Sequence, residues 1–295
     1  SFVFNHAESI RSFKASQKLD PTCAMCYWGE ALSRGPNINV TSDGKVVMSA
    51  QDRKEAYKAV GRAKELMSAA TTKEQDYILA LSSRYNGEIG TDRSGLDRNY
   101  ALAMESLYKK YPDDMDAASL YAESLMNTMP WNYWTEDGNP KPDTVKVINT
   151  LEAVLQQAPN HPLAIHLYIH AVEASSSPER AEAAADRLGA LVPGAGHLVH
   201  MPAHIYWRVG RYNDASEANI KAALADEDYI AQCNAQGFYP ALYYPHNIHF
   251  LWAASTMEGR SSLSIESALK VAKYVGPEQI RQFPVVEFFH TVPLL

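Results

Sequence analysis

The segment 159–170 reads Pro-Asn-His-Pro-Leu-Ala-Ile-His-Leu-Tyr-Ile-His, and the segment 193–204 reads Pro-Gly-Ala-Gly-His-Leu-Val-His-Met-Pro-Ala-His. The leading proline and the last two aligned histidines recur with an offset of 34 residues. An offset of this length is typical of helix–turn–helix repeats. Histidines at i and i+4 share one face of a helix. The two segments therefore predict successive helices that carry paired imidazoles on equivalent faces.

Apolar spacing predicts helices through most of the rest of the chain. Four of them precede the repeated segments, at 52–68, 73–85, 96–111 and 116–127. Long loops are expected at 35–49 and 130–143, where glycine, proline and tryptophan interrupt the helical spacing. No strand pattern is longer than a few residues. The sequence predicts an all-α fold of roughly six or seven helix pairs, in a single domain over 1–295.

One turn carries a more specific pattern, Gly210-Arg-Tyr-Asn-Asp-Ala215, which follows an aromatic helix. Gly259 takes the equivalent place one unit later, after an insertion around 226–239. This arrangement resembles the tetratricopeptide repeat (TPR) family, most closely over 143–275. The resemblance implies a right-handed α-solenoid whose first helices line a concave groove, at 160–174, 197–209 and 245–258. Ile169 and Trp252 depart from the pattern, because the family has a small residue at their position.

In TPR arrays, positions 2, 5, 9 and 12 of the first helix line the groove. Seven of the ten histidines fall on these positions when the numbering is carried over. They are His166, His200 and His249 at position 5, His170 and His204 at position 9, and His197 and His246 at position 2, with Glu173 at position 12 of the first of these repeats.

Imidazoles on adjacent helices can meet at one ion, because packed helices lie about 8–10 Å apart and metal–nitrogen bonds are near 2.0–2.1 Å. We therefore expect a transition metal ion, copper or zinc with iron also compatible. The nitrogens expected to converge within about 5 Å are those of the histidines at positions 5 and 9, flanked by His197 and His246. Glu173 would bind the ion or orient an imidazole.

The number of metal ions stays open at this point. Two groups of three histidines would suit a pair of copper ions, and three histidines with Glu173 would suit one zinc or non-haem iron. The ordinary alternative is that each buried histidine hydrogen-bonds a carbonyl or carboxylate.

Three functional classes fit these residues. The first is a metal-dependent enzyme that acts on a small molecule or peptide held in the groove. The second is a non-catalytic TPR module that binds a peptide or anionic ligand, and the third is a metal carrier. A protein partner could also bind the repeat scaffold. The loops 35–49 and 130–143 are candidate lids, and the sequence identifies no catalytic residue.

Composition and charge argue against two further kinds of protein, those that bind nucleic acid and those that span a membrane. The net charge of −7 and the absence of a basic stripe argue against nucleic acid as the main partner. No stretch approaches 18 uncharged apolar residues, so no membrane span is expected. Cys23 and Cys26 form a C-x-x-C that we interpret as two thiols packing in a helix. Ser1 and the apolar end at Leu295 suggest a piece of a longer chain, with any targeting segment outside it.

Overall fold

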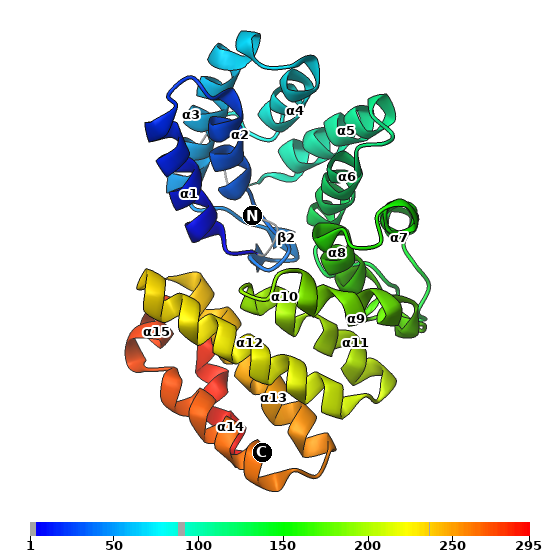
Figure 1. Cartoon of the computed structure of the whole chain (residues 1–295), viewed down its shortest axis with the longest axis vertical. Coiled ribbons are helices and arrows are strands. Elements are labelled where there is room, and N and C mark those ends of the chain that lie inside the picture. The colour runs from blue at the N-terminus through cyan, green and yellow to red at the C-terminus, as the bar shows by residue number, and fades with distance from the viewer. Residues whose placement is uncertain (1–3, 88–91, 236) are drawn as a thin grey trace. The chain divides into compact units, whose positions relative to one another are not determined.

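The chain is helical almost throughout, which confirms the all-α prediction (Figure 1). The computed structural model describes residues 4–87, 92–235 and 237–295. Ser1, on which the expectation for the N-terminus rests, lies outside the described residues. The chain divides into two compact units, Ser1–Leu167 and Tyr168–Leu295, and the boundary falls inside helix α8 (Pro162–Val172). Whether 1–295 acts as one domain stays a prediction.

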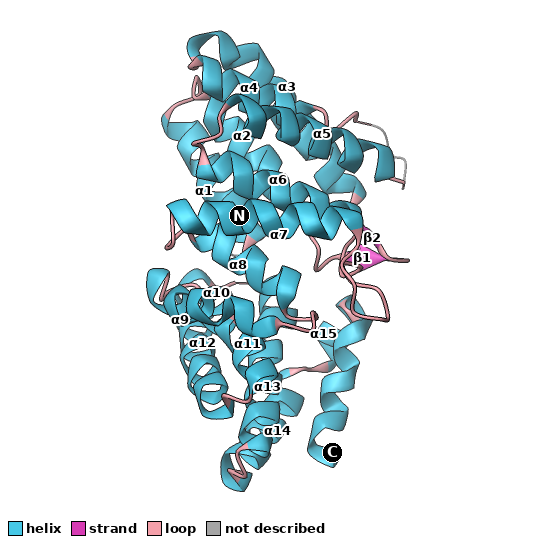
Figure 2. Cartoon of the chain, turned by 90° about the vertical axis from the view of Figure 1, so that its right-hand side faces the viewer, coloured by secondary structure: helices cyan, strands magenta, loops and turns pink. Residues whose placement is uncertain are grey.

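Helices of the first unit pack in chain order, each against the next. They are α1 (His6–Leu19), α2 (Ala24–Ser33), α3 (Ala50–Leu66), α4 (Thr72–Ser82), α5 (Ser94–Lys110), α6 (Met115–Thr128) and α7 (Pro142–Gln157), with a 3-10 turn at Met67–Ala69. Each of the four helices predicted here appears within three residues of its expected ends. The loop 35–49 contains the short antiparallel pair β1 (Thr41–Ser42) and β2 (Lys45–Val46), drawn in magenta in Figure 2.

Side-chain caps explain where several of these helices begin. Ser49, Thr71 and Asp114 each accept a hydrogen bond from a backbone N–H in the first turn of the helix that follows. At Thr71 the Glu74 side chain also accepts from the Thr71 backbone N–H, which completes a capping box. These contacts satisfy N–H groups that have no partner inside the helix.

The second unit is built from shorter helices. They are a 3-10 turn at Pro178–Ala181, α9 (Glu182–Leu191), α10 (Gly196–His200), α11 (Pro202–Val209), α12 (Tyr212–Cys233), a π-helical turn at Tyr239–Tyr243, α13 (Tyr244–Met257), α14 (Ser261–Tyr274), α15 (Pro277–Gln282) and a 3-10 segment at Pro284–Leu294. A cluster of buried apolar side chains that includes Ile248, Val271 and Phe289 holds α12, α13, α14 and the C-terminal segment together.

Two sequence predictions for the second unit need correction. The helix predicted at 197–209 is interrupted at Met201, because Pro202 has no N–H to continue the α-helical bonding pattern and instead begins α11. The insertion predicted around 226–239 is helical in its first half, since α12 continues to Cys233. The helix ends at Asn234, which adopts a left-handed conformation with φ of 46°. Residue 236 of that insertion lies outside the described residues.

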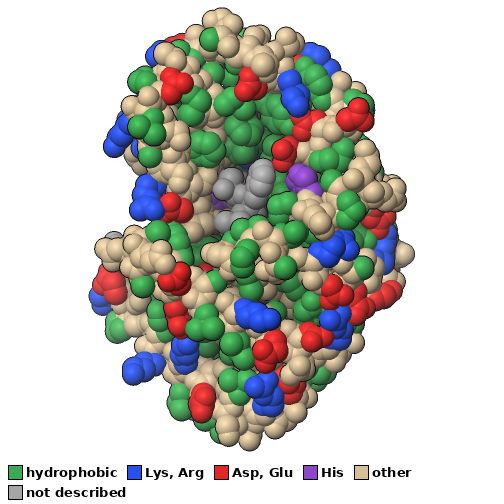
Figure 3. Space-filling view, viewed as in Figure 1, with side chains coloured by type: hydrophobic (Ala, Val, Ile, Leu, Met, Phe, Trp, Pro, Cys, Tyr) green, Lys and Arg blue, Asp and Glu red, His purple; other side chains and the backbone are tan. Residues whose placement is uncertain are grey.

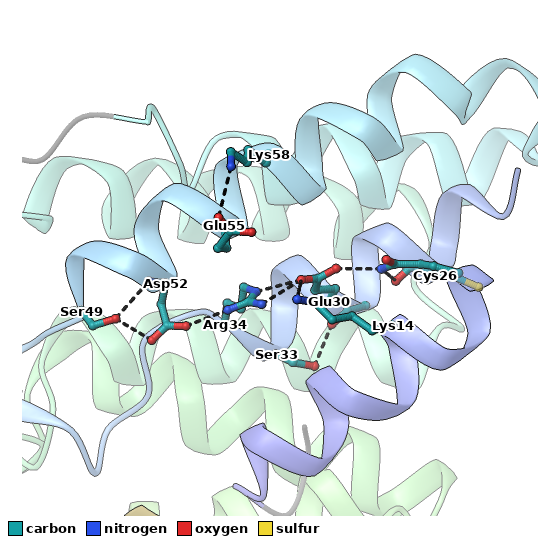
Figure 4. Close-up of polar contacts among 11 residues, drawn as sticks. Lys14, Cys26, Glu30, Ser33, Arg34, Ser49, Asp52, Glu55 and Lys58 are labelled. Carbon is teal, nitrogen blue, oxygen red and sulfur yellow. Dashed lines mark hydrogen bonds and ion pairs between the residues drawn. The ribbon is translucent and has the colours of Figure 1, made fainter. Parts of the chain in front are cut away.

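A polar network links α1, α2 and α3 in the first unit (Figure 4). Glu30 is 5 % exposed and forms an ion pair with Arg34 at 2.9 Å. Arg34 also contacts Asp52 of α3 at 2.9 Å, and Gln17 of α1 donates to Glu30 at 2.8 Å. Because a buried charge is costly unless it is paired, these contacts fix the alignment of the three helices.

Cys23 and Cys26 are joined by a disulfide, so the interpretation of two separate packing thiols is replaced. Cys23 is the N-cap of α2, and its sulfur accepts the N–H of Cys26 at 3.2 Å. A two-residue spacer allows the bond because the helix starts between the two cysteines, where the chain turns tightly.

On the face shown in Figure 3, side chains of lysine and arginine are interspersed with those of aspartate and glutamate. Among the described residues, no helix has both the length and the apolar character that crossing a membrane requires.

Replacing each of two helical glycines by alanine should change the stability of the protein in opposite directions. A Cβ added to Gly29 would lie 2.1 Å from the ring of Phe13, whereas one added to Gly61 would meet nothing within 4 Å. We expect Gly29→Ala to destabilise the protein by about 1–3 kcal/mol through overpacking. Gly61→Ala should stabilise it by about 0.5–1 kcal/mol through helix propensity. Urea unfolding measures both, and a stabilised Gly29→Ala protein would contradict the close packing of α1 on α2.

Candidate metal centre

Three helices of the second unit bring histidines together. The break between α10 and α11 lies between His200 and His204, which stay on one face because they are four residues apart. His246 comes from the first turn of α13. The ligand atoms of these three side chains all lie within 4.8 Å of one another. The structure therefore forms a group of three imidazoles from separate segments of the chain.

The close contacts in this group are between Nε2 atoms. Nε2 of His200 lies 2.8 Å from Nε2 of His204 and 3.1 Å from Nε2 of His246. In a tetrahedral site with bonds of 2.0–2.1 Å, neighbouring ligand nitrogens would be about 3.3 Å apart. The observed spacing thus needs only small ring movements to accept an ion.

Hydrogen bonds on the opposite ring nitrogen determine the tautomer of His200. Its Nδ1 lies 2.6 Å from Oδ1 of Asn219, and Nδ2 of Asn219 donates to the carbonyl of Ala215 at 2.7 Å. The second bond fixes the orientation of the amide, so the Asn219 oxygen faces the imidazole. An oxygen can only accept here, and Nδ1 of His200 therefore carries the proton.

Glu173 determines the tautomers of two further rings. This residue directly follows α8, and its two carboxylate oxygens accept from Nδ1 of His204 at 2.6 Å and from Nδ1 of His170 at 3.0 Å. Burial opposes ionisation of Glu173, but the adjacent His204 and His170 rings outweigh it and hold the pKa of the carboxyl below its usual range. Glu173 thus remains an acceptor, as carboxylates behind metal-binding imidazoles do.

These tautomers bring the lone pairs of neighbouring Nε2 atoms close together. With the hydrogen of each ring on Nδ1, the Nε2 atoms of His200 and His204 point unshared pairs at each other whenever both rings are neutral. Such an arrangement is repulsive unless a cation lies between the nitrogens. Burial lowers the pKa of His200 well below its ordinary value and that of His246 to about 3, which disfavours a second proton on either of these two rings near neutral pH.

One side of the group is apolar and part of it is accessible. The ring of Phe250, one turn after His246 on α13, lies 5.1 Å from the His200 ring and 4.9 Å from the His204 ring between centroids. His200 is fully buried, whereas His204 and His246 each keep an accessible portion. An ion bound by three nitrogens could therefore hold one further ligand from solvent.

The other histidines predicted for the site lie outside this group of three, and two of them flank it: the His170 ring lies 5.8 Å from the His204 ring and the His197 ring 6.2 Å from the His200 ring between centroids. His170 and His197 are buried with ring centroids 6.1 Å apart, and His197 meets Tyr243 edge to face at 4.8 Å. His166 is buried in the first unit, where its ring contacts Phe4 edge to face at 4.7 Å.

His249 and His246 exchange the places expected for them. His249 was expected at the centre, but its ring stacks on Trp252 at 5.2 Å and meets Phe288 and Phe289. His246 was expected at the flank, and it supplies the third nitrogen of the group. Residues three apart on a helix differ by about 60° in direction, which is enough to turn one ring toward the site and the other toward the C-terminal segment.

The remaining three histidines make ordinary polar contacts. His6 hydrogen-bonds the carbonyl of Ser33 at 2.7 Å, His161 contacts Asp116 at 3.2 Å and His290 contacts the carbonyl of Val275 at 2.5 Å.

Sequence reasoning missed a second buried polar group close to these helices. Asp226 of α12 is 1 % exposed and accepts hydrogen bonds from Tyr239 at 2.8 Å and from Asn247 at 2.7 Å. Tyr239 in turn accepts the backbone N–H of His197 at 3.2 Å. Burial raises the pKa of Asp226 to about 7.

A signal for two of the missed residues was present in α12. Asn219 and Asp226 lie at helical spacing on a buried face whose other members are small residues, namely Ala215, Ser216, Ala222 and Ala223. Buried polar side chains are usually hydrogen-bonded, and such residues mark contacts that the fold requires.

Comparisons with known protein families and with curated proteins find no match to this chain.

Proposed function

We propose that the second unit binds a transition metal ion through Nε2 of His200, His204 and His246. The observation that carries the proposal is the convergence of these nitrogens, with Asn219 and Glu173 holding the hydrogens of two rings on the opposite side. Histidines that bind metals typically donate their other N–H to such a partner. Two of the three rings are therefore already oriented for binding.

The donor set favours particular ions. Three neutral imidazoles without a thiolate suit zinc or copper, and iron is also compatible. When bound, such an ion would act as a Lewis acid toward a ligand at its remaining position. Glu173 would support the positive charge through His204, and Phe250 would limit the access of water from one side.

We also propose that the helix pairs of this unit are divergent TPR repeats. Gly210 ends α11 with φ of 81° and Gly259 follows α13 with φ of 74°, a left-handed conformation that glycine adopts readily. Each glycine separates a helix that contributes histidines from one that packs behind it. A right-handed solenoid with a concave groove, lids formed by the two long loops and a protein partner on the scaffold remain parts of this proposal.

The alternative functions predict different behaviour. A module that holds a peptide or anionic ligand through protonated histidines would bind more tightly as the pH falls. A metal site would bind less tightly, because protons compete for the same nitrogens. Burial of His200 and His246 disfavours the protonated forms that the first alternative needs. An enzyme and a carrier share the site and differ in whether the open position accepts a reacting molecule.

Metal analysis of the untagged, natively purified chain tests the proposal. We expect about one transition metal ion per chain, bound by the three nitrogens of this group. Removal with a chelator should lower the midpoint of thermal unfolding by roughly 5–10 °C, because the ion binds only the folded state. Adding the same ion back should restore the midpoint. A chain without metal that Zn²⁺ and Cu²⁺ leave unchanged would contradict the proposal.

A further inference from the structure

The first unit contains a cavity of about 580 Å³, far along the sequence from the histidine group. Its walls come from the β1–β2 hairpin, the beginning of α5 and the segment that includes the end of α6. A volume of this size is in the range that holds a small molecule. The charged and polar residues of its walls determine which kind of ligand it can bind.

Buried positive charge exceeds buried negative charge at one wall. Arg93 and Arg84 are 3 % and 2 % exposed and share a single carboxylate, that of Asp97, at 3.1 Å and 3.8 Å. Arg84 also lies near Glu123, but burial raises the pKa of that carboxyl and so disfavours its charged form. Two guanidinium groups with one carboxylate partner leave an excess of buried positive charge beside the cavity, whereas the exposed charges of its lining balance, with Lys45 and Arg98 against Asp43 and Asp92.

Asn127 is the second independent feature of the cavity wall. Its side chain is 3 % exposed, and among the described residues neither Nδ2 nor Oδ1 has a hydrogen-bond partner. Nε of Arg93, in the same wall, is also without an acceptor in the described part of the chain. Buried polar atoms of native proteins are nearly always paired, because each unpaired one destabilises the fold. An amide with both its donor and its acceptor unused therefore points to a bound molecule.

Two exposed carboxylates, Asp43 and Asp92, also line the cavity, and Asp92 already has partners. Asp92 accepts from the backbone N–H and hydroxyl of Ser94 at 2.9 Å and 2.6 Å, and its second oxygen lies 3.6 Å from Lys45. Asp92 is thus engaged, and Arg93 and Asn127 are the described residues of the wall that have buried polar atoms without a partner.

We propose that this cavity binds a small molecule that combines a carboxylate or phosphate group with hydroxyl groups. The anionic group would accept from Nε of Arg93 and from Arg98, as oxyanions commonly do with guanidinium groups. Hydroxyl groups would both donate to Oδ1 and accept from Nδ2 of Asn127. The anionic group of the ligand would thus pair with the arginines, and its hydroxyl groups would pair with the amide of Asn127.

Isothermal titration of the full chain with glycerol 3-phosphate and with glycerate tests this site, and glycerol serves as the uncharged comparison. We expect binding of at least one of the two anions, with the tighter one identifying the anionic group, and no binding of glycerol. Arg98→Gln should weaken binding about tenfold or more, the effect of losing a hydrogen bond to a charged group. If neither anion binds, or if glycerol binds equally well, the proposal is overturned.

The substitution Asn127→Leu separates a ligand contact from a structural role. Leucine has a similar volume and no polar atoms, so the unliganded variant should unfold at or above the temperature of the wild type. Its affinity for the anion that binds the wild type should fall about tenfold or more. Asn149→Leu, at an exposed position of α7, is the matched control and should keep wild-type affinity. An Asn127→Leu variant that is destabilised but binds normally would overturn the proposal.

Discussion

Replacing His200 by Ala is expected to weaken metal binding by more than about 100-fold. The loss should be larger than the roughly 10–100-fold effect of changing a residue that only hydrogen-bonds a metal ligand. His200 is the central member of the group, since its Nε2 contacts Nε2 of both His204 and His246. Without His200, the Nε2 atoms of His204 and His246 come from different helices and no longer share a ligand nitrogen that contacts both of them. Metal content after dialysis against a fixed concentration of free ion gives the occupancy directly.

Two further variants make this result specific. His161→Asn removes an imidazole in the first unit and preserves a side chain able to cap α8, where Nδ1 of His161 accepts the N–H of Ala164. It should retain full occupancy. Glu173→Gln should give an intermediate loss of about 10–100-fold, because it changes the partner of His204 and not a ligand. Circular dichroism establishes that each variant is folded. Equal occupancy in folded His200→Ala and wild-type protein would locate any metal elsewhere.

Local sequence rules are sufficient to predict the positions of most helices of the first unit. The segments predicted at 96–111 and 116–127 appear as Ser94–Lys110 and Met115–Thr128. Their limits are given by Pro112 and by the cap at Asp114, which act over a few residues and can be recognised without knowledge of tertiary structure. The same rules explain the break at Pro202, which the repeat numbering had passed over.

The candidate site could be predicted only in part, because its members are selected by helix rotation. The spacing of His200 and His204 placed both on one face, and the structure has them together. For α13, the repeat numbering favoured His249, although the π-helical turn at Tyr239–Tyr243 alters how that helix begins. A shift of one helical step exchanges His249 for His246, and the repeat period alone does not contain this information.

The polar character of Asn219 on a buried face is visible in the sequence, but its partner could not be predicted. It lies on the helix that packs behind the histidines, and its role depends on the amide orientation set by Ala215. Contacts of this kind depend on the relative positions of two helices, whereas sequence periodicity reports the buried face of one helix at a time.

Replacing Asp226 by Asn is expected to change the dependence of stability on pH. Burial raises the pKa of Asp226 from 3.8 to about 7 in the folded protein. The folded state therefore binds a proton that the unfolded state has released between these values, and stability falls as the pH rises through this range. The loss is complete above about pH 7, where the carboxylate is charged in both states. Its full size is on the order of 4 kcal/mol, from about three pKa units.

Asparagine at position 226 can replace the neutral carboxyl group in the buried network. Its oxygen can accept from Tyr239, and its Nδ2 can donate to Oδ1 of Asn247, which has no partner among the described residues, once that amide turns over. We therefore expect the variant to be more stable than the wild type at pH 8 and similar to it at pH 4. Urea unfolding of both proteins in the presence of a chelator makes the comparison, since histidine protonation then contributes equally and cancels. A difference in unfolding free energy that stays constant between pH 4 and pH 8 would mean that Asp226 is ionised throughout, with Tyr239 and Asn247 stabilising the charge more than burial opposes it.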